Sequence, residues 1–304
     1  MKKLSIFIVS VVVVLVVADL LFGVVMTFQK KIGLKGDYKP IEYVIKQCNE
    51  DVLIMGSSVV LNSLNPTIIE DSLGMSCFNA GASSQTPYYY HTILNCILKR
   101  YCPKLIVLGI RTAEFDSEDQ LQYNILVPYY HTGYSEMDSV LERKNSYEKY
   151  LLHSNLYRYN TIWFRILLYN FFGDYERGEK GFIAHEKPAM LPKMTQYNGV
   201  SRYVSVAKEN LFRDFIAICK QNNIKLIVYT PPVYSEFKNT PATVQRVVEI
   251  CKETDVPYYN DMSNNQFISQ QDLFYDQVHF NKYGAVAYTQ MFINRLRSEL
   301  KRNN

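Results

Sequence analysis

The chain has 304 residues, of which 48% are hydrophobic and 20% are charged, and this suits one large domain with additional segments. The formal net charge of +4 is mild. Lys and Arg are scattered, without a basic stripe or a nucleic-acid-binding motif, so nucleic acid is excluded as a predicted partner.

The first predicted element is a membrane-spanning helix at the N-terminus. Residues 6–26 are apolar except for Ser10, Asp19 and Gly23, and roughly 20 apolar residues suffice to cross a bilayer. Lys2 and Lys3 precede this stretch. A short basic tail before a large domain makes a cytoplasmic N-terminus and an extracytoplasmic domain the default prediction.

A cleaved signal peptide is the competing interpretation of this stretch. An uncleaved anchor is favoured because the stretch is long for a signal core, no small-x-small cleavage site follows it, and there is no lipobox cysteine. We therefore expect an anchor over 1–27, a polar linker over 28–50 and an α/β domain over 51–304. Asp19 is costly in lipid, so it either faces a partner helix or lies near the outer end of the span.

From residue 51 onward, short apolar runs alternate with segments of helical periodicity. The apolar runs predict strands at 52–56, 76–79, 104–110, 225–230 and 256–259. The helical segments lie at 65–74, 87–102 and 205–222, after Thr240-Pro241, and at 285–300. This alternation predicts a three-layer α/β/α fold with a mostly parallel, flavodoxin-like sheet.

The regular pattern is lost between about 116 and 204. This segment is aromatic and irregular, and helical pieces are expected around 135–172. We interpret it as an insertion that covers the edge of the sheet.

Six cysteines are present, and none has the spacing of a metal site. Cys77, Cys96, Cys219 and Cys251 lie within apolar patterns and are expected to be buried thiols. A disulfide that uses Cys48 or Cys102 stays open at this point.

Two distant stretches contain residues suited to acyl transfer. The first predicted strand ends in Gly56-Ser57-Ser58, which places a hydroxyl at the carboxyl edge of the sheet. Near the other end of the chain, Asp276 and His279 share one loop, where the carboxylate can hold the imidazole in one tautomer. By itself, Gly-Ser-Ser after a strand is most often a simple turn.

These stretches resemble the SGNH, or GDSL-like, hydrolase superfamily. Its members have a serine after the first strand, a Gly after the second, usually an Asn after the third, and D-x-x-H before the last helix. The resemblance implies that Ser58 is the nucleophile, His279 the base and Asp276 its orienting carboxylate. It also implies that the N–H groups of Ser58 and Gly81 bind the oxyanion.

The third block departs from the family pattern, because Gly109-Ile110-Arg111 contains no Asn. Arg111 either replaces the missing donor or forms a structural ion pair, and we favour the ion pair. Asn79 either stiffens the Gly81 loop or contacts substrate, and we favour the first. The isolated histidines, including His185, are expected to be surface or capped residues.

With its anchor, the chain is most similar to membrane-bound members that modify envelope polymers, as in teichoic-acid D-alanylation and alginate O-acetylation. The resemblance implies an esterase or O-acyltransferase that needs no cofactor or metal. It also implies an acylated polysaccharide substrate and a multi-pass membrane acyltransferase as partner. The alternatives are a catalytically idle assembly component and an accidental match of motifs.

Overall fold

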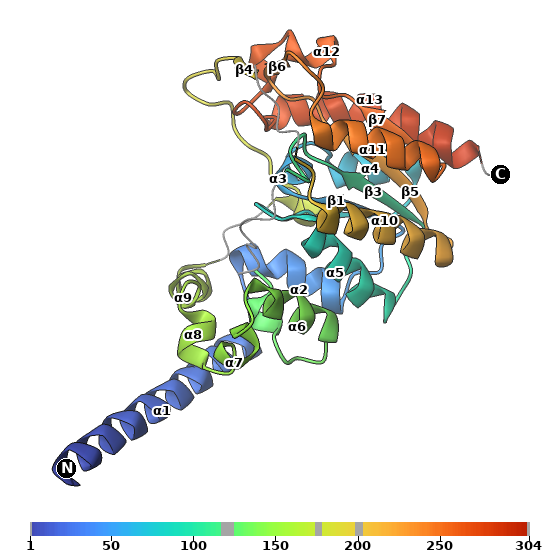
Figure 1. Ribbon diagram of the computed structural model, residues 1–304. Helices are drawn as coiled ribbons and strands as arrows, with labels where there is room; N and C mark the ends of the chain where they lie inside the picture. Colours follow the sequence, from blue (N-terminus) through green and yellow to red (C-terminus); the bar gives the residue numbers. More distant parts are fainter. Residues whose placement is uncertain (1, 117–124, 174–177, 198–202, 303–304) are drawn as a thin grey trace. The chain divides into compact units, whose positions relative to one another are not determined.

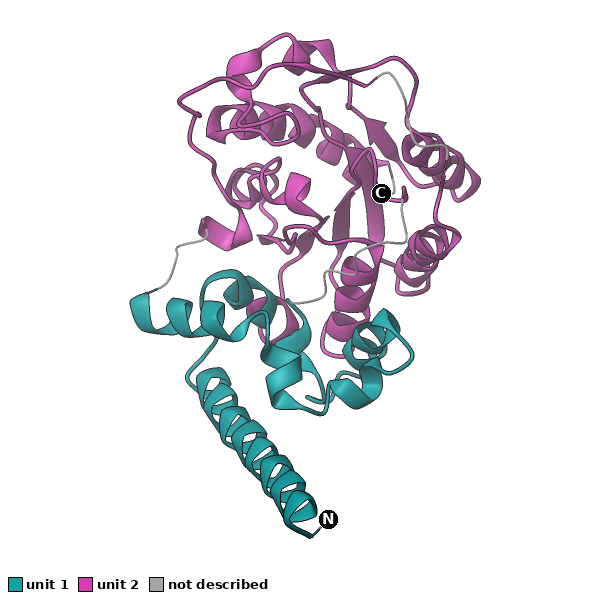
Figure 2. Ribbon diagram, turned by 60° about the vertical axis from the view of Figure 1, so that its left-hand side comes forward, with its two compact units in different colours: residues 1–42, 122–176 teal, residues 43–121, 177–304 magenta. Residues whose placement is uncertain are grey.

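The computed structural model describes residues 2–116, 125–173, 178–197 and 203–302. The chain forms two compact units, which are described separately below (Figure 2). Unit 1 comprises residues 1–42 and 122–176, and unit 2 comprises residues 43–121 and 177–304.

Unit 2 contains a parallel five-stranded sheet in the order β2-β1-β3-β5-β7. The strands are β1 (Val52–Gly56), β2 (Cys77–Asn79), β3 (Leu105–Gly109), β5 (Lys225–Thr230) and β7 (Tyr258–Asn260). Every residue of β1 and β3 is buried, as expected of strands covered on both faces. The predicted flavodoxin-like order and the predicted strands are confirmed.

Helices cover both faces of this sheet (Figure 1). One face carries α4 and α13, which contact each other, and the other carries α5 and α10. The helices of unit 2 are α3 (Ser58–Leu61), α4 (Pro66–Leu73), α5 (Pro87–Leu98), α10 (Val206–Gln221), α11 (Ala242–Glu253), α12 (Asn265–Ile268) and α13 (Lys282–Lys301). The predicted three-layer α/β/α arrangement is therefore confirmed.

The starts of the two helices on the first face follow from their capping residues. At the start of α4, the Asn65 side chain accepts hydrogen bonds from the N–H groups of Thr67 and Ile68. At the start of α13, the Asn281 side chain accepts hydrogen bonds from the N–H groups of Tyr283 and Gly284. Gly74 ends α4 with a φ of 65°, a left-handed conformation that glycine adopts without a steric penalty.

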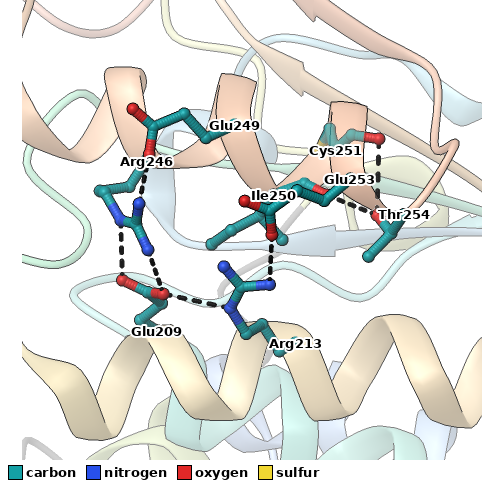
Figure 3. Close-up of polar contacts among 8 residues, drawn as sticks. All are labelled: Glu209, Arg213, Arg246, Glu249, Ile250, Cys251, Glu253 and Thr254. Atoms are coloured by element: carbon teal, nitrogen blue, oxygen red, sulfur yellow. Dashed lines mark hydrogen bonds and ion pairs between the residues drawn. The ribbon is translucent and has the colours of Figure 1, made fainter.

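Arginine–carboxylate pairs connect α10 and α11 (Figure 3). Arg246 of α11 donates Nε and Nη2 to the carboxylate of Glu209, at 2.9 and 2.6 Å, and also pairs with Glu249. Arg213 of α10 donates to Glu209 and to Glu253 of α11. This network, which includes the bidentate Arg246–Glu209 pair, aligns the helices that lie before and after β5 in the chain.

The end of the irregular segment packs beside the sheet edge. The short helix η4 (Glu179–Gly181) lies against β2, where a Cβ at Gly181 would be 2.1 Å from the carbonyl oxygen of Asn79. A small parallel sheet, not expected from sequence, pairs β4 (Thr195–Tyr197) with β6 (Ser235–Phe237). Three-residue strands carry too little periodicity to be recognised.

The predicted linker over 28–50 is corrected. Helix α2 (Lys39–Lys46) occupies its second half, and Ile41, Val44 and Ile45 of this helix are buried. Their spacing follows a helical period that was obscured by the surrounding lysines and acidic residues.

Unit 1 is helical in its described residues. It contains α1 (Lys2–Lys31), η1 (Gly36–Tyr38), η2 (Val127–Tyr129), α6 (Ser135–Leu141), η3 (Glu142–Lys144), α7 (Glu148–Leu151), α8 (Asn155–Tyr159) and α9 (Trp163–Phe172). Residues 122–176 thus group with the N-terminal helix, whereas the prediction placed the whole segment 116–204 on the sheet. Among the described residues, α1 is the one helix long and apolar enough to cross a membrane.

All six cysteines are free, and the disulfide left open for Cys48 or Cys102 is not formed. Five of them are buried, including the four predicted to be buried thiols.

Candidate active site

The end of β1 creates the turn that presents Ser58. Gly56 has a φ of +144°, and a Cβ there would lie 2.5 Å from both the Gly109 carbonyl oxygen and a methyl group of Val60. A side chain is therefore excluded where β1 ends beside β3. Ser58 begins α3 two residues later, so its hydroxyl lies at the carboxyl edge of the sheet.

The two distant stretches meet at this edge. The Nε2 atom of His279 lies 2.9 Å from the Oγ atom of Ser58, within hydrogen-bond distance. On the other side of the ring, Nδ1 lies 2.8 Å and 3.0 Å from the two carboxylate oxygens of Asp276. Because a carboxylate only accepts, Nδ1 carries the proton, and Nε2 is free to accept the Ser58 hydroxyl proton.

The backbone of the loop orients Asp276. The Oδ1 atom of Asp276 accepts hydrogen bonds from the backbone N–H groups of Val278 and His279, each at 2.8 Å. Burial of the Asp276 carboxyl opposes its ionisation, but hydrogen bonds from the His279 ring and from these N–H groups hold its pKa below the usual range. The carboxylate therefore stays ionised beside the imidazole.

The site lies at the topological switch point of the sheet. The strand order reverses between β1 and β3, where open α/β folds form their ligand crevice. Ser58 follows β1 and Arg111 follows β3, so adjacent strands bring these two residues to the same crevice.

Arg111 forms the ion pair that was favoured from sequence. Its Nε atom donates to Glu114 at 2.9 Å, and the Glu114 side chain is fully buried. The Glu114 carboxylate raises the pKa of Arg111 further above its usual range, so the guanidinium stays charged. Its terminal nitrogen atoms have no acceptor within the described part of the chain, and Arg111 lines the same cavity as Ser58. Arg111 is therefore both paired and able to donate toward a ligand.

The Gly81 N–H, predicted as an oxyanion donor, already has a partner in the structure. It donates to the Oδ1 atom of Asn79 at 3.0 Å. The Asn79 amide donates to the carbonyl oxygens of Val60 and Leu64. Asn79 is wholly buried, and its hydrogen bonds hold the loop after β2, which is the role favoured from sequence.

The Ser58 N–H is available as an oxyanion donor. Among the described residues it has no hydrogen-bond acceptor, because it is the first N–H of α3. The second donor inferred from the family pattern, the Gly81 N–H, is hydrogen-bonded to Asn79, and Arg111 is a charged donor that lines this cavity.

A cavity of about 450 Å³ adjoins Ser58 and His279. Its walls include Arg111, the aromatic pair Tyr197 and Phe237, and several small apolar side chains. The two aromatic rings are stacked, with centroids 5.1 Å apart and planes inclined by 8°. The cavity therefore combines apolar surface with a few polar groups, as ligand sites generally do.

His185 is a neighbour of the site that sequence reasoning did not find. Its ring stacks on Tyr275 with centroids 4.2 Å apart, and it meets the His279 ring edge to face at 6.2 Å. Burial and the neighbouring His279 lower the pKa of His185. No local motif marks this residue, because it comes from the irregular segment before β4.

Within the described residues, no group of three or more His, Cys, Asp or Glu side chains could hold a metal ion. The fold and the site together define an α/β protein with a hydrogen-bonded serine, histidine and aspartate at the carboxyl edge of a parallel sheet. This is the arrangement of a serine-dependent acyl-transfer site.

No protein-family model and no curated protein matches the chain. Solved structures do match it. The psychrotrophic esterase EstA from Pseudoalteromonas sp. is 12% identical with a TM-score of 0.43, and the match covers 83% of this chain and 98% of the esterase.

Two further matches have similar scores. A GDSL-like lipase from Bacteroides thetaiotaomicron is 13% identical with a TM-score of 0.40, over 86% of this chain and 98% of the lipase. A catalytic mutant of the acetylxylan esterase Axe2 from Geobacillus stearothermophilus is 12% identical with a TM-score of 0.42, over 81% and 93%. At these identities and scores, the similarity assigns no activity to this chain.

Proposed function

We propose that this protein is a membrane-anchored serine esterase or O-acyltransferase that acts on acyl esters of a cell-envelope polysaccharide. The observation that carries the proposal is the continuous hydrogen-bonded path from Ser58 through His279 to Asp276. These three groups supply the nucleophile, the base and the orienting carboxylate that acyl transfer needs.

The reaction begins when the Ser58 oxygen attacks the carbonyl carbon of the ester while His279 Nε2 takes the hydroxyl proton. The Asp276 carboxylate stabilises the imidazolium that forms. The Ser58 N–H and the Arg111 guanidinium stabilise the negative oxygen of the tetrahedral intermediate. Its collapse expels the alcohol, to which His279 returns the proton, and leaves the acyl group on Ser58.

The acyl-enzyme then reacts with water or with a sugar hydroxyl, which His279 deprotonates as its oxygen attacks the acyl carbon. The bond from this carbon to the Ser58 oxygen breaks, and His279 returns the proton to Ser58. Water gives an esterase, and a sugar hydroxyl gives an O-acyltransferase. In the second case, a multi-pass membrane acyltransferase supplies acyl groups, as the family resemblance implies. The stacked Tyr197 and Phe237 at the cavity wall support a sugar ligand, because aromatic faces suit the apolar faces of sugar rings.

The membrane part of the proposal is supported by α1. Its residues from Asp19 to Gln29 contact α8 and α9 within unit 1, so removal of α1 as a signal peptide would strip these helices of their partner. The short basic N-terminus favours an extracytoplasmic position for the folded part of the chain. Protease accessibility in intact cells and in inside-out vesicles measures this orientation.

A fluorophosphonate probe that reacts with activated serines tests the catalytic proposal. We expect the full-length protein to be labelled at Ser58 and the Ser58→Ala variant to stay unlabelled. Ser57→Ala is the matched control, because Ser57 is the adjacent serine, is buried, and makes no capping hydrogen bond with its side chain. Labelling of Ser58→Ala equal to wild type would refute the assigned nucleophile.

A second function is favoured by one observation, the engagement of the Gly81 N–H by Asn79. A site with a weakened oxyanion hole suits a catalytically idle binding or assembly component of an envelope-modifying complex. Correctly folded wild-type protein that resists the probe and binds acylated glycan without turnover would establish this alternative.

A further inference from the structure

The outer half of α1 is an integral part of unit 1. The Asp19 carboxylate accepts hydrogen bonds from the Ser154 hydroxyl at 2.6 Å and from the Leu156 N–H at 2.8 Å, at the start of α8. Almost three turns further on, Gln29 is buried and bonds the Asn170 side chain of α9 at 2.9 Å. α8 and α9 therefore run beside α1 from about residue 19 to residue 29.

Close packing reinforces these polar contacts. A Cβ at Gly23 would lie 2.5 Å from the Asn155 side chain, so the two helices approach as closely as glycine permits. The Phe22 ring packs edge to face against Trp163, with centroids 6.3 Å apart.

The side of α1 that faces away from these contacts is still apolar at the same level. Val24, Val25 and Phe28 are exposed, with Val24 at 67%, and Ile32 directly after the helix is also exposed. The exposed apolar surface of α1 therefore continues past Asp19 as far as Phe28, beside α8 and α9.

Helix α9 adds an exposed surface of the same kind. It is apolar at every position except Arg165, Tyr169 and Asn170, yet Ile166 is its one fully buried residue. Arg165 pairs with Asp37, and Asn170 bonds Gln29, so its most polar groups are engaged within unit 1. We define the apolar face as the exposed apolar side chains of α8 and α9: Leu156, Trp163, Phe164, Leu168, Phe171 and Phe172.

The length of α1 gives the depth of this face. At about 1.5 Å per residue, Phe22 lies about 27 Å along the helix from Leu4, close to the roughly 30 Å thickness of a hydrocarbon core. Trp163, which packs on Phe22, is thus placed at the boundary between hydrocarbon and headgroups, where tryptophan is enriched. Gln29 lies about 38 Å from Leu4, at headgroup level.

We propose that the apolar face is a lipid-contact surface that seats unit 1 in the bilayer leaflet on the side of the folded domain. This inference rests on the membrane anchoring proposed above. Lipid is the occupant because the apolar face is continuous with the exposed apolar surface of α1, and because its depth is that of the interface. The protein would then be held at the membrane surface by the spanning helix α1 and by the helices α8 and α9 that pack beside the outer half of α1.

Trp163 is the one tryptophan in the chain and is 39% exposed, so the wild-type protein carries its own probe. The full-length protein is reconstituted in vesicles of phosphatidylcholine and phosphatidylglycerol, with and without brominated acyl chains. We expect brominated lipids to quench Trp163 emission strongly, and aqueous iodide to quench it weakly. Trp163→Phe gives the background, and vesicle flotation reports anchoring independently.

The outcomes separate the two proposals. Flotation with quenching by iodide but not by brominated lipid overturns the lipid-contact surface and leaves the anchor intact. Flotation with protection from both quenchers also overturns it, since a protein segment would then cover the face. Failure to float overturns the anchor, and the surface with it.

A matched pair of charge substitutions adds a second readout. Phe164→Glu places a charge on the apolar face, and we expect it to reduce quenching of Trp163 by brominated lipid severalfold. Tyr283→Glu makes the same change at a similarly exposed aromatic residue of α13 and should leave quenching unchanged. Equal quenching in both variants would contradict the proposal.

Discussion

The two units of this protein differ in how many large apolar side chains of their helices and strands are left exposed. In unit 2, apolar side chains such as Leu105 and Val107 are fully buried, and the reactive polar groups lie at the edge of the sheet. In unit 1, Phe171 and Phe172 are 71% and 85% exposed, whereas the polar Gln29 is buried and hydrogen-bonded.

If the apolar face lies in lipid, as proposed above, the two units meet different solvents. Burial of apolar surface stabilises a domain in water, as in unit 2. In contact with lipid tails, apolar side chains gain nothing from burial, and polar contacts between helices stabilise the packing instead. The five experiments below test this contrast, in order of decreasing expected effect.

The largest effect is expected at the base of the triad. Replacing His279 with Ala removes the proton acceptor of Ser58, so turnover of an activated acyl ester should fall by about 10³-fold or more. His91→Gln is the control, because His91 bonds Asp214 on the helical face of unit 2, away from the triad. Activity that survives His279→Ala in a folded protein would contradict the assignment.

The next largest effect is expected at Arg111. If its guanidinium stabilises the oxyanion, its loss should lower kcat by about 10²-fold with a smaller change in KM. Since Arg111→Ala alone would leave the buried Glu114 unpaired, the double variant Arg111→Gln/Glu114→Gln serves as the test that keeps a neutral pair. An unchanged kcat in the folded double variant would reduce Arg111 to a structural ion pair.

Asn79 should matter for stability more than for chemistry. Asn79→Ala leaves the Leu64 carbonyl oxygen and the Gly81 N–H without this partner and removes one of the hydrogen bonds to the Val60 carbonyl oxygen, which should lower the free energy of unfolding by about 2–4 kcal/mol. Asn49→Ala, at an exposed position, should change it by less than about 0.5 kcal/mol. Urea denaturation measures both. A stable but inactive Asn79→Ala protein would instead indicate a contact with substrate.

Replacing Asp19 tests whether polar contacts between helices stabilise unit 1. Asp19→Ala removes the acceptor at the start of α8 and should cost about 0.5–2 kcal/mol of local stability. Limited proteolysis of residues 125–173 in detergent should then be faster than in wild type, with Asp19→Asn intermediate. Ser10→Ala, whose hydroxyl bonds only the helix backbone, is the control. Equal cleavage rates would show that α1 and α8 do not depend on each other.

The smallest effect is the pH dependence that His185 contributes. Because burial lowers the pKa of His185 in the folded protein, the unfolded chain takes up this proton first as pH falls. Stability should therefore decrease from pH 7 toward pH 5, below the ordinary histidine pKa of about 6.5. His185→Gln should remove part of this decrease in denaturation midpoints. A steeper decrease in the variant would reverse the sign assigned to His185.

Much of unit 2 was predictable from local patterns. The apolar run before Gly56 and the capping pair Asn65-Pro66 determine their elements through neighbouring residues alone, and the structure has both where they were expected. The pairing of Ser58 with the Asp276–His279 loop was also predicted, but only through a resemblance of motifs. No local rule brings together residues 221 positions apart.

Other features depend on contacts that no stretch of sequence contains. The engagement of Gly81 by Asn79, the approach of His185 to His279, and the binding of Asp19 by α8 each join segments whose spacing shows no pattern.

The sequence by itself determined the alternating strands and helices, the apolar N-terminal helix and the residue types of the triad, because periodicity and capping act between near neighbours. Only the tertiary structure decided which donors near Ser58 already have a hydrogen-bond partner and which helices pack beside α1. Hydrogen bonds are short and directional. Whether a donor is free to bind a ligand therefore depends on whether folding brings an acceptor within about 3 Å of it.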